Sequence, residues 1–113
     1  MIDPELRARL AEAAAEPDRG GLTRAGRSLH KKGSRPSSVY PLPTGGPESL
    51  NRAAQGIVEA ILNDPGAELI QERRPRFGAV VEVWAPDGRG LRYSDDGRFF
   101  IGFLEPRGEV RRG

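Results

Sequence analysis

The segment AVVEVWAPDGRGLRYSDDGRFFIGFL, residues 79–104, alternates apolar and polar side chains in short runs. Such period-two alternation is typical of strands with one buried face, and the Asp-Gly pairs between the runs supply the positive φ that tight turns need. A similar run of alternating side chains, residues 67–74, precedes the segment. The predicted strands are 67–74, 79–85, 90–94 and 98–104, with turns at 75–78, 86–89 and 95–97. Because short turns force neighbouring strands to be antiparallel, the sequence predicts a four-stranded meander.

A helix is predicted immediately before the strands, over residues 47–62. Its apolar residues follow i, i+3, i+4, i+7 spacing, and the helix ends at the breaker Asn63-Asp64-Pro65-Gly66. The stripe consists of Leu50, Ala53, Ala54, Ile57, Val58, Ile61 and Leu62. One main helix packed on a meander gives an α+β domain of two layers.

Alternation also assigns the two faces of the sheet. The side predicted to pack under the helix carries Val81, Val83, Leu91, Tyr93, Phe99, Ile101 and Phe103. The open side carries Glu82, Trp84, Arg92 and Arg98. Phe100 next to Phe99 breaks the alternation, which indicates either a bulge or an aromatic side chain on the open face.

The first half of the chain is predicted to hold two short helices and a long loop. Asp3-Pro4 forms a typical start for a helix that reaches Ala15, and Thr23 caps a second helix over 24–32. Residues 34–47 are rich in Pro and Gly and are expected to be irregular. We predict that residues 1–21 form a helix and linker, and that 22–113 form one domain with its core at 47–106.

Composition excludes several classes of function. The chain has 113 residues, no Cys and one His, which excludes disulfides, Fe–S clusters, thiolate zinc sites and sites with several His ligands. We therefore expect no metal and no cofactor. No apolar run of membrane-spanning length occurs, and the first residues lack the apolar region of a signal peptide. The GxxxxGK and GxSxG motifs of P-loop enzymes and serine hydrolases are also absent.

Charge is distributed unevenly although the formal net charge is only +2. Residues 19–36 contain six basic side chains and no acid, and 73–113 contain nine Arg against six acids. Residues 1–18 and 37–72 are acidic. A basic segment beside an Arg-rich half suits a polyanion such as RNA, whereas the alternative is an ordinary surface of solvated Arg.

Several short motifs resemble the C-terminal toxin domains of bacterial polymorphic and contact-dependent growth inhibition systems. They include Ala25-Gly26-Arg27 with Lys31-Lys32-Gly33, then Arg76-Phe77-Gly78, Pro86-Asp87-Gly88-Arg89-Gly90 and Ile101-Gly102-Phe103-Leu104. The resemblance covers about residues 24–106. It implies a ribonuclease of the barnase–EndoU–colicin–RelE group, in which an antiparallel sheet carries the catalytic face opposite the helix. Relatives often have a His within the Lys31-Lys32-Gly33 segment and another before Arg76, whereas here His30 lies early and 73–75 read Arg-Arg-Pro.

Metal-independent cleavage of RNA needs a base for the 2′-OH, cations for the phosphorane and an acid for the leaving oxygen. We predict Glu82 as the base, His30 as the acid, and Arg92 and Arg76 as phosphate clamps. The predicted RNA-binding residues are Arg27, Lys31, Lys32, Arg35, Arg74, Arg89 and Trp84. Each also has a structural alternative: a cross-strand ion pair for Glu82 and Arg92, a solvated helix end for His30, a turn for Arg89 and packing for Trp84.

These observations predict a ribonuclease toxin that acts on tRNA or another structured RNA in the cytoplasm of a competing cell. The products would carry a 2′,3′-cyclic phosphate, and an acidic immunity protein would cover the basic face of a domain that is monomeric when free. The alternative is a module that binds RNA or protein on the same face without catalysis.

Overall fold

The computed structural model describes residues 2–106 and confirms the predicted α+β fold. Its helices are α1 (Pro4–Ala14), the 3-10 turn η1 (Arg19–Gly21), α2 (Arg24–Gly33) and α3 (Pro47–Asn63). Its strands are β1 (Glu68–Arg74), β2 (Gly78–Trp84), β3 (Gly90–Ser94) and β4 (Phe100–Leu104). The strands form one antiparallel sheet in the order β1-β2-β3-β4, which is the predicted meander.

Local interactions explain where the helices begin and where the chain turns between strands. The Asp3 carboxylate accepts hydrogen bonds from the Glu5 and Leu6 amides, each at 3.1 Å, and so caps α1. Thr23 Oγ1 accepts the Gly26 amide at 2.9 Å and caps α2 in the same way. Gly88 and Gly97 have φ of +97° and +75°, as the Asp-Gly turns require.

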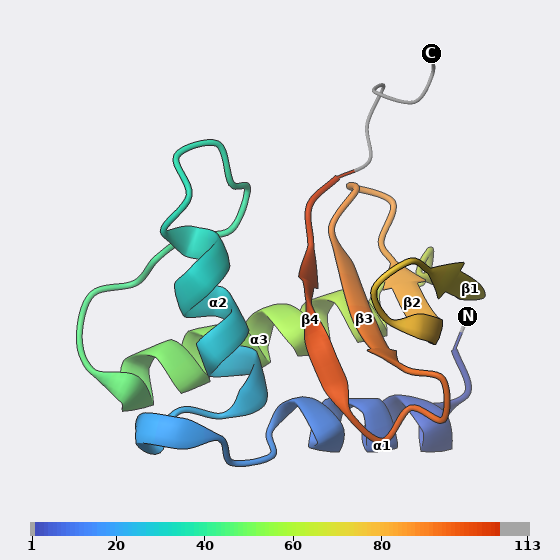
Figure 1. The fold of residues 1–113 in the computed structure, drawn as a ribbon, viewed down its shortest axis with the longest axis horizontal. Coiled ribbons are helices and arrows are strands. Elements are labelled where there is room, and N and C mark those ends of the chain that lie inside the picture. The colour runs from blue at the N-terminus through green and yellow to red at the C-terminus, as the bar shows by residue number, and fades with distance from the viewer. Residues whose placement is uncertain (1, 107–113) are drawn as a thin grey trace.

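The helices cover one side of the sheet and leave most of the other side open (Figure 1). In this view α3 passes behind the strands, α1 runs along their lower end, and α2 stands beside β4. One apolar core joins all three helices to the sheet. Its fully enclosed members are Leu10, Ala14, Ala25, Leu29, Ala54, Val58, Ile61, Val83, Leu91 and Tyr93.

The predicted face of two residues near β4 is wrong. Phe99 precedes the strand and is 49% exposed, whereas Phe100 is buried against Tyr93, with 5.3 Å between ring centroids. The register shifts between Arg92 and Tyr93, so that Tyr93 pairs with Phe100 while Arg92 pairs with Gly102. This bulge leaves Ile101 outside the core cluster and turns it towards the open face, where it lines a cleft.

Helix α1 packs on the core shared by the other elements. Leu10 has no exposed surface, and its carbonyl oxygen accepts a hydrogen bond from Tyr93 Oη at 2.9 Å. The division after residue 21 stays a prediction, and residues 107–113 of the predicted domain lie outside the described residues. Among residues 2–106, no helix combines the length and apolar character needed to cross a membrane.

Candidate nucleic-acid interface

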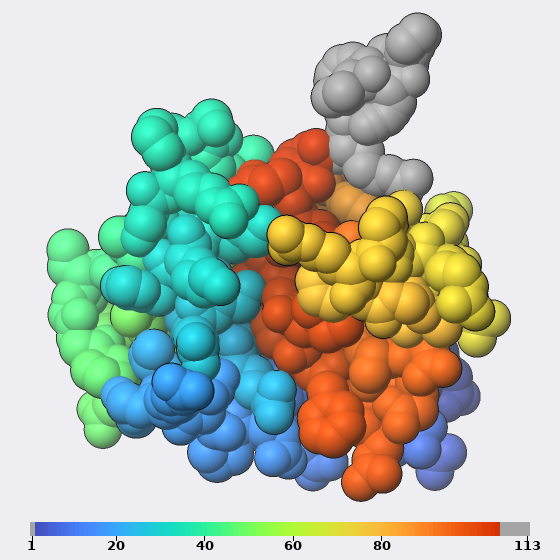
Figure 2. Space-filling model, in the orientation of Figure 1, coloured from blue at the N-terminus to red at the C-terminus, as the bar shows by residue number. Residues whose placement is uncertain are grey.

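A cleft of about 550 Å³ opens between α2 and the sheet. Figure 2 shows it as a hollow between the cyan surface of α2 and the yellow turn that joins β1 to β2, with β4 at its floor. The floor is largely apolar and comes from β4, including Ile101 and Leu104.

The rim of this cleft is strongly cationic. Seven of the lining side chains are basic and Asp18 is acidic. The basic residues are Arg24, Arg27, Lys31, Lys32, Arg35, Arg76 and Arg92. Within residues 2–106, Arg27 forms an ion pair with Asp18 at 3.5 Å and Arg92 forms one with Glu82, and no other member of the seven does. A concave surface with this excess of positive charge concentrates anions.

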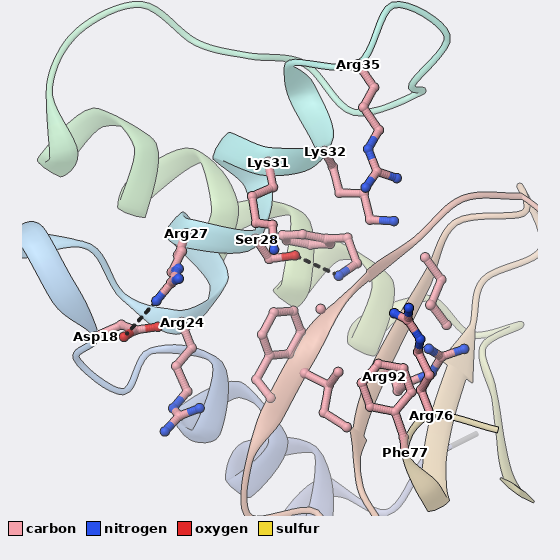
Figure 3. Close-up of a pocket in the computed structure, with 15 residues that line it drawn as sticks. Asp18, Arg24, Arg27, Ser28, Lys31, Lys32, Arg35, Arg76, Phe77 and Arg92 are labelled. Atoms are coloured by element: carbon pink, nitrogen blue, oxygen red, sulfur yellow. Dashed lines mark hydrogen bonds and ion pairs between the residues drawn. The ribbon is translucent and has the colours of Figure 1, made fainter. Parts of the chain in front are cut away.

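Helix α2 supplies most of these cations because their spacing places them on one side. Arg24, Arg27 and Lys31 follow i, i+3, i+7 spacing, whereas Ala25 and Leu29 point into the core. Figure 3 shows the labelled α2 side chains on the cleft side of the helix, with Arg76 and Arg92 across from them.

Two side-chain hydrogen-bond networks fix α2 against its neighbours. Ser28 Oγ accepts the Phe103 amide of β4 at 3.0 Å. From α3, Asn51 accepts the Thr23 amide and donates to the Gly21 carbonyl, both at 2.9 Å. The cations of α2 therefore have a defined position relative to the sheet.

Behind the cleft, the buried carboxylate of Glu82 lies at the centre of a partly exposed ionic cluster. This carboxylate has no exposed surface and accepts two hydrogen bonds from Arg74, at 2.9 and 2.8 Å. Arg92 Nε donates at 2.9 Å and Trp84 Nε1 at 3.2 Å. The predicted cross-strand pairing of Glu82 with Arg92 is present in the register of β2 and β3.

This cluster keeps Glu82 ionised. Burial alone raises the pKa of Glu82, but the hydrogen bonds from Arg74, Arg92 and Trp84 together outweigh it and hold the pKa below its usual value. The carboxylate of Glu82 is therefore charged and fully hydrogen-bonded to its neighbours. It orients Arg92, the arginine that enters the cleft.

Arg92 joins the cluster to the cleft. Its side chain is 18% exposed, with Nε on Glu82 and its guanidinium carbon 5.0 Å from the centroid of the Phe77 ring. An arginine held by a carboxylate on one side and a ring on another loses little conformational freedom when it binds phosphate.

Lys32 is a half-buried cation of α2. Burial is the main cause that lowers the pKa of its ammonium group, Arg35 lowers it further, and Glu105 acts in the opposite direction. Lys32 therefore loses its proton at a lower pH than an isolated lysine does.

The structure brings six of the predicted site residues together around the cleft: Arg27, Lys31, Lys32, Arg35, Arg76 and Arg92. Glu82 and Arg74 lie behind Arg92. His30 is exposed on α2 and does not line the cleft, and Arg89 pairs with Asp87 at 2.9 Å in the β2–β3 turn. Trp84 bonds to Glu82 and lies against Gly90, where an added Cβ would come within 2.7 Å of the indole.

Sequence reasoning did not select Arg24, Ser28 or Phe77 as site residues, although all three line the cleft. The helical spacing of Arg24 with Arg27 was an available signal. The sequence carried no such signal for Phe77, because an aromatic residue in a turn is equally consistent with packing.

Comparisons with known proteins agree with this architecture. The family model described as CdiA C-terminal tRNase toxin domain matches residues 11–105. The chain is also similar to the toxic C-terminal tip of CdiA from Pseudomonas aeruginosa, whose crystal structure contains an immune protein. That match has a TM-score of 0.70 and 28% identity, and covers 83% of this chain and 99% of the other. No match is found among curated proteins. With most of its length matched by the family model, the chain belongs to the CdiA C-terminal tRNase toxin domains.

Proposed function

We propose that this domain is a metal-independent ribonuclease that cleaves tRNA in the cytoplasm of competing bacteria. Membership of a tRNase toxin family supports a tRNA-cleaving toxin. The observation that carries the proposal for this chain is the cleft, in which seven cations surround an apolar floor. That charge suits the RNA backbone, and the volume admits a nucleotide.

In the proposed reaction the 2′-oxygen of the substrate attacks the adjacent phosphorus and the bond from phosphorus to the 5′-oxygen breaks. A base takes the 2′-OH proton, an acid protonates the leaving oxygen, and the products are a 2′,3′-cyclic phosphate and a 5′-OH. Arg92 and Arg76, on the same wall of the cleft, would stabilise the charge that develops on the phosphorane. Glu82 would act as a positioning residue for Arg92.

Three side chains are candidates for proton transfer. Glu82 as base and His30 as acid stay predictions, since the first is enclosed by its arginines and the second faces solvent outside the cleft. Lys32 is the third candidate, because it lines the cleft and its pKa is lowered, chiefly by burial. A neutral amine there would accept the 2′-OH proton.

The direct test is incubation of the purified protein with total tRNA in EDTA, followed by a denaturing gel and mapping of the new ends. We expect discrete fragments with cyclic phosphate ends, and loss of most cleavage in Arg92→Ala. Arg52→Ala, an exposed position of α3 outside the cleft, is the matched control and should cleave normally. Intact tRNA in EDTA, with magnesium and with cell extract would contradict the proposal.

One observation favours a second candidate, an RNA-binding module without catalysis. Among the described residues that line the cleft there is no His, and the one carboxylate, Asp18, is paired with Arg27. Salt-sensitive binding of tRNA without strand scission under all three conditions would support this candidate instead.

We also propose an acidic immunity protein as the partner of the same cleft. The similar CdiA structure contains an immune protein, and the cations here would attract a carboxylate-rich surface. Such a protein should compete with tRNA for a monomeric toxin domain, and simultaneous binding of both would contradict a shared surface.

A further inference from the structure

Two exposed phenylalanines flank the cationic cleft. Four large apolar side chains among residues 2–106 are exposed, and two of them, Phe77 and Phe99, are 47% and 49% exposed. Phe77 lines the cleft from the β1–β2 turn. Phe99 does not itself line the cleft, but it directly precedes Phe100, which does, and it contacts Arg24 of the rim.

At least one arginine guanidinium lies close to each ring. The guanidinium carbon of Arg92 lies 5.0 Å from the centroid of Phe77, and those of Arg24 and Arg98 lie 5.4 and 5.9 Å from that of Phe99. Figure 3 shows Arg24, the rim residue beside Phe99, and Phe77 on opposite sides of β4. Both rings lie outside the core cluster.

We propose that Phe77 and Phe99 are stacking platforms for two unpaired bases, and that the cleft therefore takes single-stranded RNA. An exposed ring beside guanidinium groups suits a nucleotide, since the ring contacts the base and the cation contacts its phosphate. Bases inside a duplex are stacked on each other and cannot reach either ring. This inference rests on the proposed function and specifies its substrate: unpaired segments of a structured RNA, such as its loops or ends.

A protein segment with apolar side chains is the other occupant that two exposed rings could take. The surroundings favour RNA, because seven cations line the cleft beside the rings and an uncharged peptide would leave them without counter-charges.

Binding of uncleavable strands tests the inference. A short 2′-O-methyl RNA strand cannot undergo 2′-OH attack, so its affinity is measured without turnover. It is compared by fluorescence anisotropy with a strand of equal length that lacks bases and with its own duplex. We expect the full strand to bind about fivefold or more tightly than the strand without bases.

The variants Phe77→Ala and Phe99→Ala should each reduce the affinity for the full strand by about fivefold or more and leave the strand without bases unaffected. Val39→Ala, at an apolar position that is 50% exposed outside the cleft, is the matched control. Equal binding of the full, abasic and duplex forms by the unmodified protein would overturn the inference. The inference would also be overturned if the Phe variants weakened binding of an immunity protein and left binding of RNA unchanged. Cleavage of tRNA is scored separately, so that the proposed function can stand while the stacking inference falls.

Discussion

Glu82 illustrates how the surroundings of one side chain determine its role. A carboxylate on the open face of a sheet is a reasonable base when only its position in a strand is known. In the structure, however, its oxygens accept hydrogen bonds from Arg74, Arg92 and Trp84, and none of its surface is exposed. In the structure Glu82 holds an arginine at the edge of the cleft, and its action as a base stays a prediction.

Replacement of Glu82 by Gln should reduce stability as well as cleavage. Loss of charged hydrogen bonds costs about 1.5–3 kcal/mol, and the partial exposure of Arg92 and Arg74, 18% and 29%, keeps the cost below that of a fully buried pair. Because folding lowers the pKa of Glu82, its contribution is complete above the unfolded pKa and is lost as pH falls through the folded pKa. Urea denaturation from pH 6 to pH 3 should therefore show a weaker pH dependence for Glu82→Gln, and equal dependence in both proteins would contradict the argument.

Lys32 gives a prediction about the pH profile of cleavage. If its neutral amine accepts the 2′-OH proton, the rate rises with pH along a limb whose pKa lies below the ordinary 10.5 of lysine. Lys32→Arg retains the charge and removes the proton acceptor, because arginine stays protonated. We expect cleavage to fall and this limb to disappear, while the affinity for uncleavable RNA changes little. Lys31→Arg, on the same helix, should retain the limb.

At the scale of elements, the patterns that predicted the fold are those set by local chemistry. The Asp-Gly turns, the caps at Asp3 and Thr23 and the stripe of α3 each depend on residues close in sequence, and the structure confirms them. The faces of Phe99 and Ile101 could not be predicted in this way. Two adjacent aromatics allow two registers, and the choice between them depends on packing of Phe100 against Tyr93, which is a tertiary contact.

Because α1 contacts the core, the predicted domain boundary after residue 21 can be tested by mutation of α1. Leu10→Ala should lower the free energy of unfolding by about 2–5 kcal/mol, because the side chain is fully buried between α1 and the sheet. Arg9→Ala, exposed on the same helix, is the control for helix propensity. Urea denaturation measures both. A cost below about 1 kcal/mol for Leu10→Ala, together with full stability of a 22–113 fragment, would instead favour a domain that excludes α1.

At the scale of the whole molecule, the cleft exists only because distant segments meet. Its cations come from α2, from the loop that follows α2, from the β1–β2 turn and from β3. The turn is separated from α2 by more than the length of α3. The basic composition of residues 19–36 predicted a cationic segment, and its contact with RNA stays a prediction. It could not show that Arg76 faces Lys32 or that His30 points away, because both depend on how α2 is docked by Ser28 and Asn51.

This arrangement predicts how salt affects tRNA binding. Log affinity should fall linearly with log salt, and loss of one phosphate contact should reduce the slope by about 0.7 to 0.9. Lys31→Gln and Arg35→Gln should each produce a reduction of this size. Arg52→Gln, with equal loss of net charge outside the cleft, should leave the slope almost unchanged. Titrations between low and physiological salt measure all three, and equal slopes would indicate that net charge alone drives binding.

The hydrogen bond from Tyr93 to the carbonyl of Leu10 joins positions that are 83 residues apart. The core likewise runs from Ile2 to Phe103, so residues from both ends of the described chain contribute to it. Helix α1 already has a partner in α3, where Gln55 donates to the Ala11 carbonyl at 2.9 Å, but the core is complete only when β3 and β4 add Tyr93, Phe100 and Phe103. A fragment that stops short of these two strands lacks both the floor of the cleft and the strand that carries Arg92, so it cannot form the cleft.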